Sequence, residues 1–269
     1  MDDSRVEQLW DEIWNLLEDG RTEAAVQRAL EVLNEDDDVP ELRYLLGVGL
    51  LDLGEPEAAI TEFEAAVAAV PDWSDAQSAL AWANFRACRF DAIAEPLGAA
   101  FDADPDNADA HQLRALIAER ENDEPLAIVE FAEARRLDPD RYPEPYSMAE
   151  DEFLACAQAV VAELDEPIRE VLEETSFFVQ AIPSLELLRG TEPPLDPQIL
   201  GLFVGQSLLE QSVTESGALP NTMYLFQRNL ERVATSREEL EEEIRITVLH
   251  EIGHHLGWDE EELEERGLA

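Results

Sequence analysis

Small and apolar side chains recur along the first half of the chain with a period of about 34 residues. Pro71, Pro105 and Pro139 mark this period, and aspartate follows each of them. Between the prolines the same columns hold alanine, leucine or phenylalanine: Leu46, Gly47, Ala59, Phe63 and Ala66; Leu80, Ala81, Ile93, Leu97 and Ala100; Ala115, Ala127, Phe131 and Ala134. Small residues let two antiparallel helices approach closely, so the pattern predicts stacked helix pairs with turns at the Asp-Pro-Asp phrases.

This period and these columns resemble the tetratricopeptide repeat, whose repeat length is about 34 residues. The predicted repeats cover residues 40–73, 74–107 and 108–141. A degenerate copy, about 6–39, precedes them, with Gly20, Ala25 and Ala29 in the columns of Gly54, Ala59 and Phe63. The resemblance implies an all-α repeat domain, 1–145, that binds a protein or peptide.

The pattern changes near residues 140–146, a proline-rich stretch that we take as a linker. Beyond it, helical periodicity predicts helices at 149–164 and 166–173. Short apolar runs bounded by turn residues predict strands at 177–182, 200–205 and 222–226, the second with glycines that mark close backbone approach. A short helix near 230–234 and a long one from 236 or 237 to 256, opened by a Ser236–Glu239 capping box, complete a predicted α+β domain, 146–269.

The long helix ends in His250-Glu251-Ile252-Gly253-His254-His255, which contains the pattern H-E-x-x-H. Histidines four residues apart lie on one face of a helix, where both can hold one metal ion, and the glutamate can act as general base. Three of the four histidines fall within six residues, and the flanking positions are apolar. The motif therefore predicts a metal centre with His250 and His254 as ligands and Glu251 as the catalytic base.

Residues 148–269 resemble the small bacterial minimal-zincin metallopeptidases. The matching phrases are residues 200–205, residues 216–220 and the motif segment 247–257. The resemblance implies a zinc-dependent peptidase, with Zn²⁺ as cofactor and Glu251 as the base that activates water. In the family's pattern, H-E-x-x-H-x-x-G-x-x-D, the final acid is taken as the third ligand, and Glu260 occupies that position here, beside Asp259.

The residues themselves limit the third ligand in the same way. Only 15 residues follow His254, and no histidine follows His255. We therefore expect an acid just beyond Gly257: Glu260 first, Asp259 as the alternative, then Glu261, with an upstream residue or water also open. His255 points about 100° away from His254 around the helix, so we expect it to pack rather than bind the ion.

Two functions follow as hypotheses. The first is a zinc metallopeptidase whose repeat array holds a protein substrate, with the strand 222–226 offering an edge to an extended peptide. The alternative is a non-catalytic interaction scaffold whose zincin domain binds metal structurally or is inactive. Replacement of the family's final aspartate by Glu260 is the feature that favours this alternative.

The charge of the chain restricts its partners. The formal net charge is −45, and all 18 basic residues are arginine. Such a surface disfavours nucleic acid and anionic membranes. We interpret the acidity mainly as a solvated surface suited to solubility or salt, and secondarily as attraction for a basic partner.

Three further features complete the sequence predictions. Neither a signal peptide nor a long apolar run is visible in the chain, so we expect a cytoplasmic protein. Cys88 and Cys156 are isolated and predict neither a disulfide framework nor a thiolate zinc site. His111 stands alone in the third repeat and is expected to be structural.

Overall fold

The structure is a computed structural model, and it describes residues 2–36, 38–163, 169, 175–205, 221–256, 258 and 262–263. It divides into two compact units. Unit 1 comprises Met1–Tyr142 together with Leu188–Asp196, and unit 2 comprises Pro143–Leu187 together with Pro197–Ala269. Within the described residues, no helix is both long enough and apolar enough to cross a membrane.

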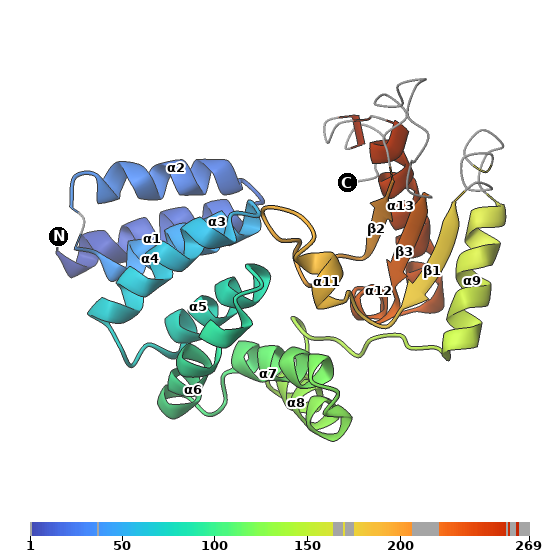
Figure 1. Ribbon diagram of the computed structural model, residues 1–269. Helices are drawn as coiled ribbons and strands as arrows, with labels where there is room; N and C mark the ends of the chain where they lie inside the picture. Colours follow the sequence, from blue (N-terminus) through green and yellow to red (C-terminus); the bar gives the residue numbers. More distant parts are fainter. Residues whose placement is uncertain are drawn as a thin grey trace. The chain divides into compact units, whose positions relative to one another are not determined.

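Unit 1 is built from antiparallel helix pairs that follow the predicted repeats (Figure 1). The first pair is α1 (Asp3–Glu18) and α2 (Thr22–Leu33), and the second is α3 (Pro40–Asp52) and α4 (Pro56–Ala69). The remaining helices are α5 (Ser74–Arg86), a short 3-10 turn η1 (Phe90–Ala92), α6 (Ala94–Ala103), α7 (Ala108–Arg120) and α8 (Glu124–Leu137). The chain is therefore mostly helical here, with tetratricopeptide-like repeats.

The turn inside each helix pair is made the same way four times. Gly20, Gly54, Cys88 and Asn122 occupy the same position of successive repeats and all have positive φ, at 71°, 74°, 55° and 60°. The residue after each one donates its backbone N–H to a carbonyl five residues earlier, at 2.8 Å in every case. This is the Schellman arrangement that ends a helix through a left-handed residue. Cys88 and Asn122 carry a side chain in this conformation, so the turn recurs at the same repeat position even where glycine is absent.

Close packing within a pair depends on small residues facing large ones. A Cβ at Gly47 of α3 would lie 2.6 Å from the ring of Phe63 in α4, and Phe63 is fully buried. Ala59 and Ala66 of α4 are also fully buried. The columns singled out in the sequence are therefore helix–helix contact positions.

Unit 1 also holds a segment that lies far away in sequence, Leu188–Asp196. Asp196 pairs with Arg86 at the end of α5, with Oδ2 2.5 Å from Nε. The thiol of Cys88 donates to the carbonyl of Leu195 at 3.3 Å, and Arg189 donates to the carbonyl of Cys88 at 2.9 Å. The sequence predicted a second domain continuous from residue 146; in the structure this segment groups with the repeats.

Unit 2 is a small α+β region around a three-stranded sheet. Its elements are α9 (Glu150–Ala162), β1 (Ser176–Gln180), α11 (Leu185–Leu188), β2 (Gly201–Val204), β3 (Thr222–Phe226), α12 (Gln227–Arg232) and α13 (Arg237–Leu256). The strand order is β1-β3-β2, with β1 parallel and β2 antiparallel to β3. The short helix predicted at 166–173 lies almost entirely outside the described residues.

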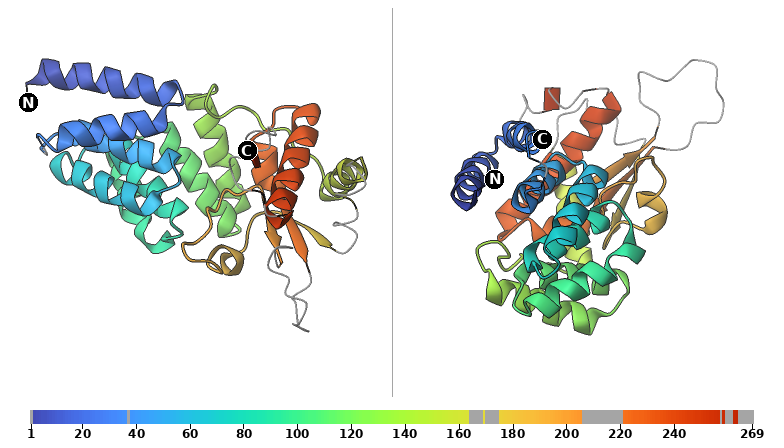
Figure 2. Two further views of the ribbon diagram at one scale, coloured as in Figure 1. Left: turned by 90° about the horizontal axis from the view of Figure 1, so that it is seen from above. Right: turned by 90° about the vertical axis from the view of Figure 1, so that its left-hand side faces the viewer.

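One face of this sheet forms the core of unit 2. Met223 and Leu225 of β3 pack with Phe153 of α9 and with α13, and all three side chains are fully buried. Figure 2 shows α13 running along the sheet. Because successive strand residues point to opposite faces, Tyr224 lies on the other face, stacked between Phe178 and Phe226.

Candidate metal centre

Helix α13 starts with a side-chain cap. Ser236 Oγ accepts the backbone N–H of Glu239 at 3.2 Å, as a capping box requires. The Glu239 carboxylate reaches back to Thr235, accepting from its backbone N–H and its hydroxyl at 2.7 Å each. These hydrogen bonds lower the pKa of Glu239. The cap satisfies backbone N–H groups at the start of α13, the helix that carries the motif.

The apolar side of α13 orients the motif. Ile244, Val248 and Ile252 recur every four residues, and they are 0%, 0% and 1% exposed in the core of unit 2. Burial of this stripe leaves His250, Glu251 and His254 on flanks that are half-buried. The motif side chains are therefore held beside the core without being sealed in it.

A glycine of β2 lets α13 approach the sheet. A Cβ at Gly201 would lie 2.6 Å from Cγ2 of Thr247 and 3.4 Å from Cγ of Glu251. The backbone carbonyl of Tyr224 would be 3.2 Å away on the strand side. The glycines of the strand predicted at 200–205 were expected to mark close approach, and Gly201 does so at the motif helix.

His250 and His254 face each other through the same ring atom. Their Nε2 atoms are 2.9 Å apart, and their ring centroids are 4.5 Å apart with the planes at 84°. Both residues come from the last turns of α13, one helical turn apart, as the motif spacing requires.

Glu251 is held from the sheet. Its Oε2 accepts the backbone N–H of Phe203 in β2 at 2.8 Å. No signal in the sequence pointed to this contact, because a backbone amide carries no residue type and Phe203 is recognisable only as a strand residue. The bond fixes the direction of the carboxylate next to the histidine pair.

The histidine pair fits a zinc ion in its chemistry and spacing. Imidazole nitrogen is a common metal ligand in proteins, and these two Nε2 atoms lie close enough together to hold one ion. In a tetrahedral site with Zn–N bonds of about 2.0–2.1 Å, two ligand nitrogens are about 3.3 Å apart. The observed 2.9 Å requires only a small opening of the pair. Within the described part of the chain, no group of three histidine, cysteine, aspartate or glutamate residues is assembled.

The predicted third ligands lie outside the described residues. Asp259, Glu260 and Glu261 are not described, nor is the side chain of His255. Trp258 and Leu263, described residues on either side of them, pack against α13 at Gly253. Trp258 donates its backbone N–H to the Gly253 carbonyl at 2.9 Å, and a Cβ at Gly253 would lie 2.6 Å from Leu263 and 2.7 Å from Trp258.

One sequence prediction is wrong. The strand predicted at 222–226 is β3, but it is the central strand and has no edge to offer an extended peptide. β1 pairs with it along its whole length on one side, and β2 pairs with it on the other. The sequence located the strand but could not give the strand order, because pairing depends on contacts between distant segments.

His111 lies in unit 1, away from the motif in sequence. It is 8% exposed, with Nδ1 2.6 Å from Oε2 of Glu130 and Nε2 3.0 Å from the carbonyl of Pro105. Arg114 holds the other oxygen of Glu130. His111 is thus a buried, hydrogen-bonded residue of the third repeat.

Comparisons with known proteins match both halves of the chain. Residues 172–268, which include the whole H-E-x-x-H motif, match the family model described as zincin-like metallopeptidase. Residues 16–83 match the family model described as tetratricopeptide repeat. No curated protein matches the chain.

Several solved structures resemble the chain at low identity. A thermophilic TPR protein of Thermus thermophilus, TTC0263, is 20% identical with a TM-score of 0.45, covering 62% of this chain and 87% of that one. YrrB, described as a TPR protein with an unusual peptide-binding site, is 19% identical with a TM-score of 0.43, covering 52% and 72%. A MamA protein is 21% identical with a TM-score of 0.43, covering 53% and 79%.

Proposed function

We propose that this chain, which joins a tetratricopeptide-repeat region to a zincin-like metallopeptidase domain, is a zinc-dependent peptidase whose repeats bind a protein or peptide. The observation that carries the proposal is the meeting of two Nε2 atoms, 2.9 Å apart, on a helix that also carries Glu251. The match of residues 172–268 to the zincin-like family supports the same interpretation.

His250 and His254 would hold the zinc ion, with Glu260 as third ligand and Asp259 as the alternative. Zinc, when bound, supplies a Lewis acid that makes a water molecule more acidic and polarises a peptide carbonyl. Glu251 acts as general base, accepting a proton from the attacking water and returning it to the leaving amine. The Phe203 amide holds one oxygen of Glu251 at 2.8 Å, so the carboxylate is already oriented for that transfer.

The test compares metal content and proteolysis in the full-length chain. Zinc per chain is measured by elemental analysis, and cleavage is measured with a denatured protein mixture. We expect Glu251→Gln to retain zinc and lose cleavage, and His254→Ala to lose both. Glu243→Gln, an acid-to-amide change two turns earlier on α13, is the matched control and should retain both.

The outcomes separate the two functions. A wild-type chain that binds no stoichiometric zinc overturns the proposal. A wild-type chain that binds zinc and cleaves nothing supports instead a non-catalytic scaffold with a structural metal.

A second set of variants tests the third ligand. Glu260→Ala should weaken zinc binding by more than about 100-fold, since even supporting residues around a metal site contribute 10- to 100-fold. Glu262→Ala, an exposed acid two residues on, is the control and should change zinc affinity little. If Asp259→Ala gives the large effect and Glu260→Ala does not, the ligand is Asp259.

A further inference from the structure

An acidic residue recurs at one position of the repeats. Glu41, Asp75 and Asp109 occupy this position in three successive repeats, each in the first turn of the first helix. A negative charge in the first turn interacts favourably with the helix dipole, which accounts for an acid at Glu41. Asp75 and Asp109 have a further feature, because aromatic rings and a cation lie beside them.

Asp75 and Asp109 influence each other. Burial raises the pKa of Asp75, and the nearby charges of Asp109 and Asp104 raise it further. Its Oδ1 accepts a hydrogen bond from the side-chain amide of Asn107 at 3.2 Å. Two carboxylates whose charges repel each other favour the arrival of a positive charge.

Aromatic rings form the wall next to these carboxylates. The rings of Tyr44 and Trp73 are 4.7 Å apart, and Trp10 stacks on Tyr44 with centroids 5.8 Å apart. All three rings are half-buried and so keep some surface exposed. Burial raises the pKa of Tyr44, and the charges of Asp75 and Asp109 raise it further, so both carboxylates lie near the phenol. Aromatic faces beside carboxylates are what binds a cationic side chain.

The chain places one of its own cations at this position. Arg141 pairs with Asp109, with Nε 3.2 Å from Oδ1, and Tyr142 donates its hydroxyl to the same oxygen at 2.5 Å. Burial alone would lower the pKa of Arg141, but Asp109, Tyr142 and Tyr44 raise it overall. The Arg141 side chain is still 62% exposed, so a competing cation can reach the same carboxylate.

A buried hydroxyl lies on the same helix, α5. Ser78 follows Asp75 by three residues and occupies the position that Tyr44 has in the preceding repeat. It is 1% exposed, and its Oγ has no hydrogen-bond partner among the described residues. A buried hydroxyl without a partner costs about 1–3 kcal/mol.

We propose that Tyr44, Trp73, Asp75 and Asp109, here the cation site, bind an arginine or lysine side chain of a basic protein segment. Arg141 occupies the site in the free chain and is displaced by the ligand. The inference rests on the proposed peptide-binding role of the repeats and names the class of peptide.

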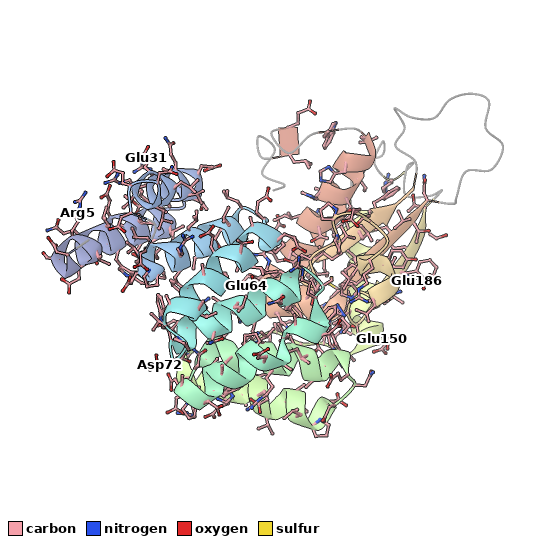
Figure 3. All side chains as sticks on the ribbon, turned by 60° about the vertical axis from the view of Figure 1, so that its left-hand side comes forward. Arg5, Glu31, Glu64, Asp72, Glu150 and Glu186 are labelled. Carbon is pink, nitrogen blue, oxygen red and sulfur yellow. The ribbon has the colours of Figure 1, made fainter. Side chains whose placement is uncertain are left out.

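The general acidity of the surface does not by itself select such a ligand. Glu31, Glu64 and Asp72 of unit 1, labelled in Figure 3, are exposed acids that attract any cation at long range. The cation site differs because its carboxylates are flanked by aromatic rings and by a resident arginine. Asp72 therefore serves as a matched control for Asp75, three residues away and with the same charge.

The experiment measures binding to the full-length chain in the Glu251→Gln background, so that cleavage plays no part. The probe is a blocked nine-residue peptide with three arginines among glycines, titrated by calorimetry at physiological salt. The comparison peptide replaces each arginine by citrulline, which keeps the shape and removes the charge. We expect the arginine peptide to bind and the citrulline peptide to bind at least about tenfold more weakly.

Variants locate the binding. Asp75→Asn with Asp109→Asn should weaken the arginine peptide about tenfold, and Asp72→Asn less than about twofold. Arg141→Ala should tighten binding by removing the competitor. If the double variant fails to fold, as judged by circular dichroism, Asp75→Asn alone and Arg141→Ala carry the test.

Three results overturn the inference: equal affinity for the two peptides, equal weakening by Asp72→Asn and Asp75→Asn, or no tightening by Arg141→Ala. None of them bears on zinc content or cleavage by the wild-type chain. Conversely, a chain that binds no zinc leaves this binding test intact.

Discussion

The histidines of the two units differ in what their ring nitrogens face. In unit 1 both nitrogens of His111 face oxygen acceptors, a carboxylate of Glu130 and the carbonyl of Pro105. In unit 2 the Nε2 atoms of His250 and His254 face each other. A ring whose two nitrogens both have oxygen partners in the protein has no nitrogen left for a metal ion, whereas two ring nitrogens that face each other can hold one ion together. Residue type is the same in both places; the neighbours decide the chemistry.

The largest expected effect tests this comparison through zinc. His250→Ala should lower zinc affinity by more than about 100-fold, because it removes one of the two histidines proposed as ligands. His111→Ala should leave zinc affinity unchanged, because its nitrogens already bind protein oxygens. Zinc affinity is measured by competition with a chromophoric chelator. Equal loss in the two variants would contradict the distinction between the sites.

The next effect concerns stability, and here His111 rather than His250 is the residue expected to matter. Among the described residues, Glu130 has two side-chain partners, His111 and Arg114, and is 5% exposed. His111→Ala removes one of them and should cost about 2–3 kcal/mol in free energy of unfolding. Urea denaturation monitored by circular dichroism measures this loss. Gln112→Ala, the half-buried neighbour on α7, is the control and should cost less than about 1 kcal/mol. A loss as small as that of the control would show that the His111 network is not stabilising.

Two glycines, Gly201 and Gly98, differ in how closely other atoms pack against them. Gly201→Ala should destabilise the chain by about 1–3 kcal/mol, since the new Cβ meets Thr247 at 2.6 Å and pushes α13 from β2. Gly98→Ala in α6 meets nothing within 4 Å and should stabilise by about 0.5–1 kcal/mol through helix propensity. Thermal unfolding of both variants measures the signs. Equal signs would mean that the close approach at the motif helix is not required.

The smallest effect concerns two carboxyls with opposite pKa shifts. The pKa of Asp75 is raised in the folded chain, so its ionisation destabilises the fold at pH values above the folded-state pKa. Below the unfolded-state pKa of about 3.9 the carboxyl is mostly protonated in both states, and this cost disappears. The pKa of Glu239 is lowered in the folded chain, so its ionised carboxylate stabilises the fold at pH values above the unfolded-state pKa of about 4.3. This stabilisation is lost as the pH falls through the folded-state pKa.

Asp75→Asn should therefore raise the melting temperature at pH 7, and Glu239→Gln should lower it. Both differences from the wild type should shrink as the pH falls toward 3. Melting temperatures across pH 3–7 measure this, and shifts of equal sign at pH 7 would contradict the assigned causes.

Local structure was largely predictable from the sequence. The strand predicted at 222–226 is β3 to the residue, and the long helix predicted from 236 or 237 to 256 is α13. Helix periodicity, the Ser236 cap and the repeat columns are encoded by neighbours in sequence, so they can be recognised without a fold. The family of each half was also correct, because the repeat period and the H-E-x-x-H phrase are themselves local patterns.

Contacts between distant segments were not predictable. The central place of β3 removed the docking edge expected for it. The Phe203 amide that holds Glu251 lies 48 residues away in sequence and leaves no mark in it. The segment Leu188–Asp196 groups with the repeats through Arg86 and Cys88, more than 100 residues earlier.

The sequence by itself determined the helices, the repeat period and the three residues of the motif, because each depends on spacing along one helix or one repeat. Only the tertiary structure decided that Glu251 is oriented from β2, that Gly201 admits α13 to the sheet, and that Arg141 lies beside Asp109. These depend on which surfaces meet after the chain has folded, and the energy of such contacts is set by distance and burial rather than by residue order.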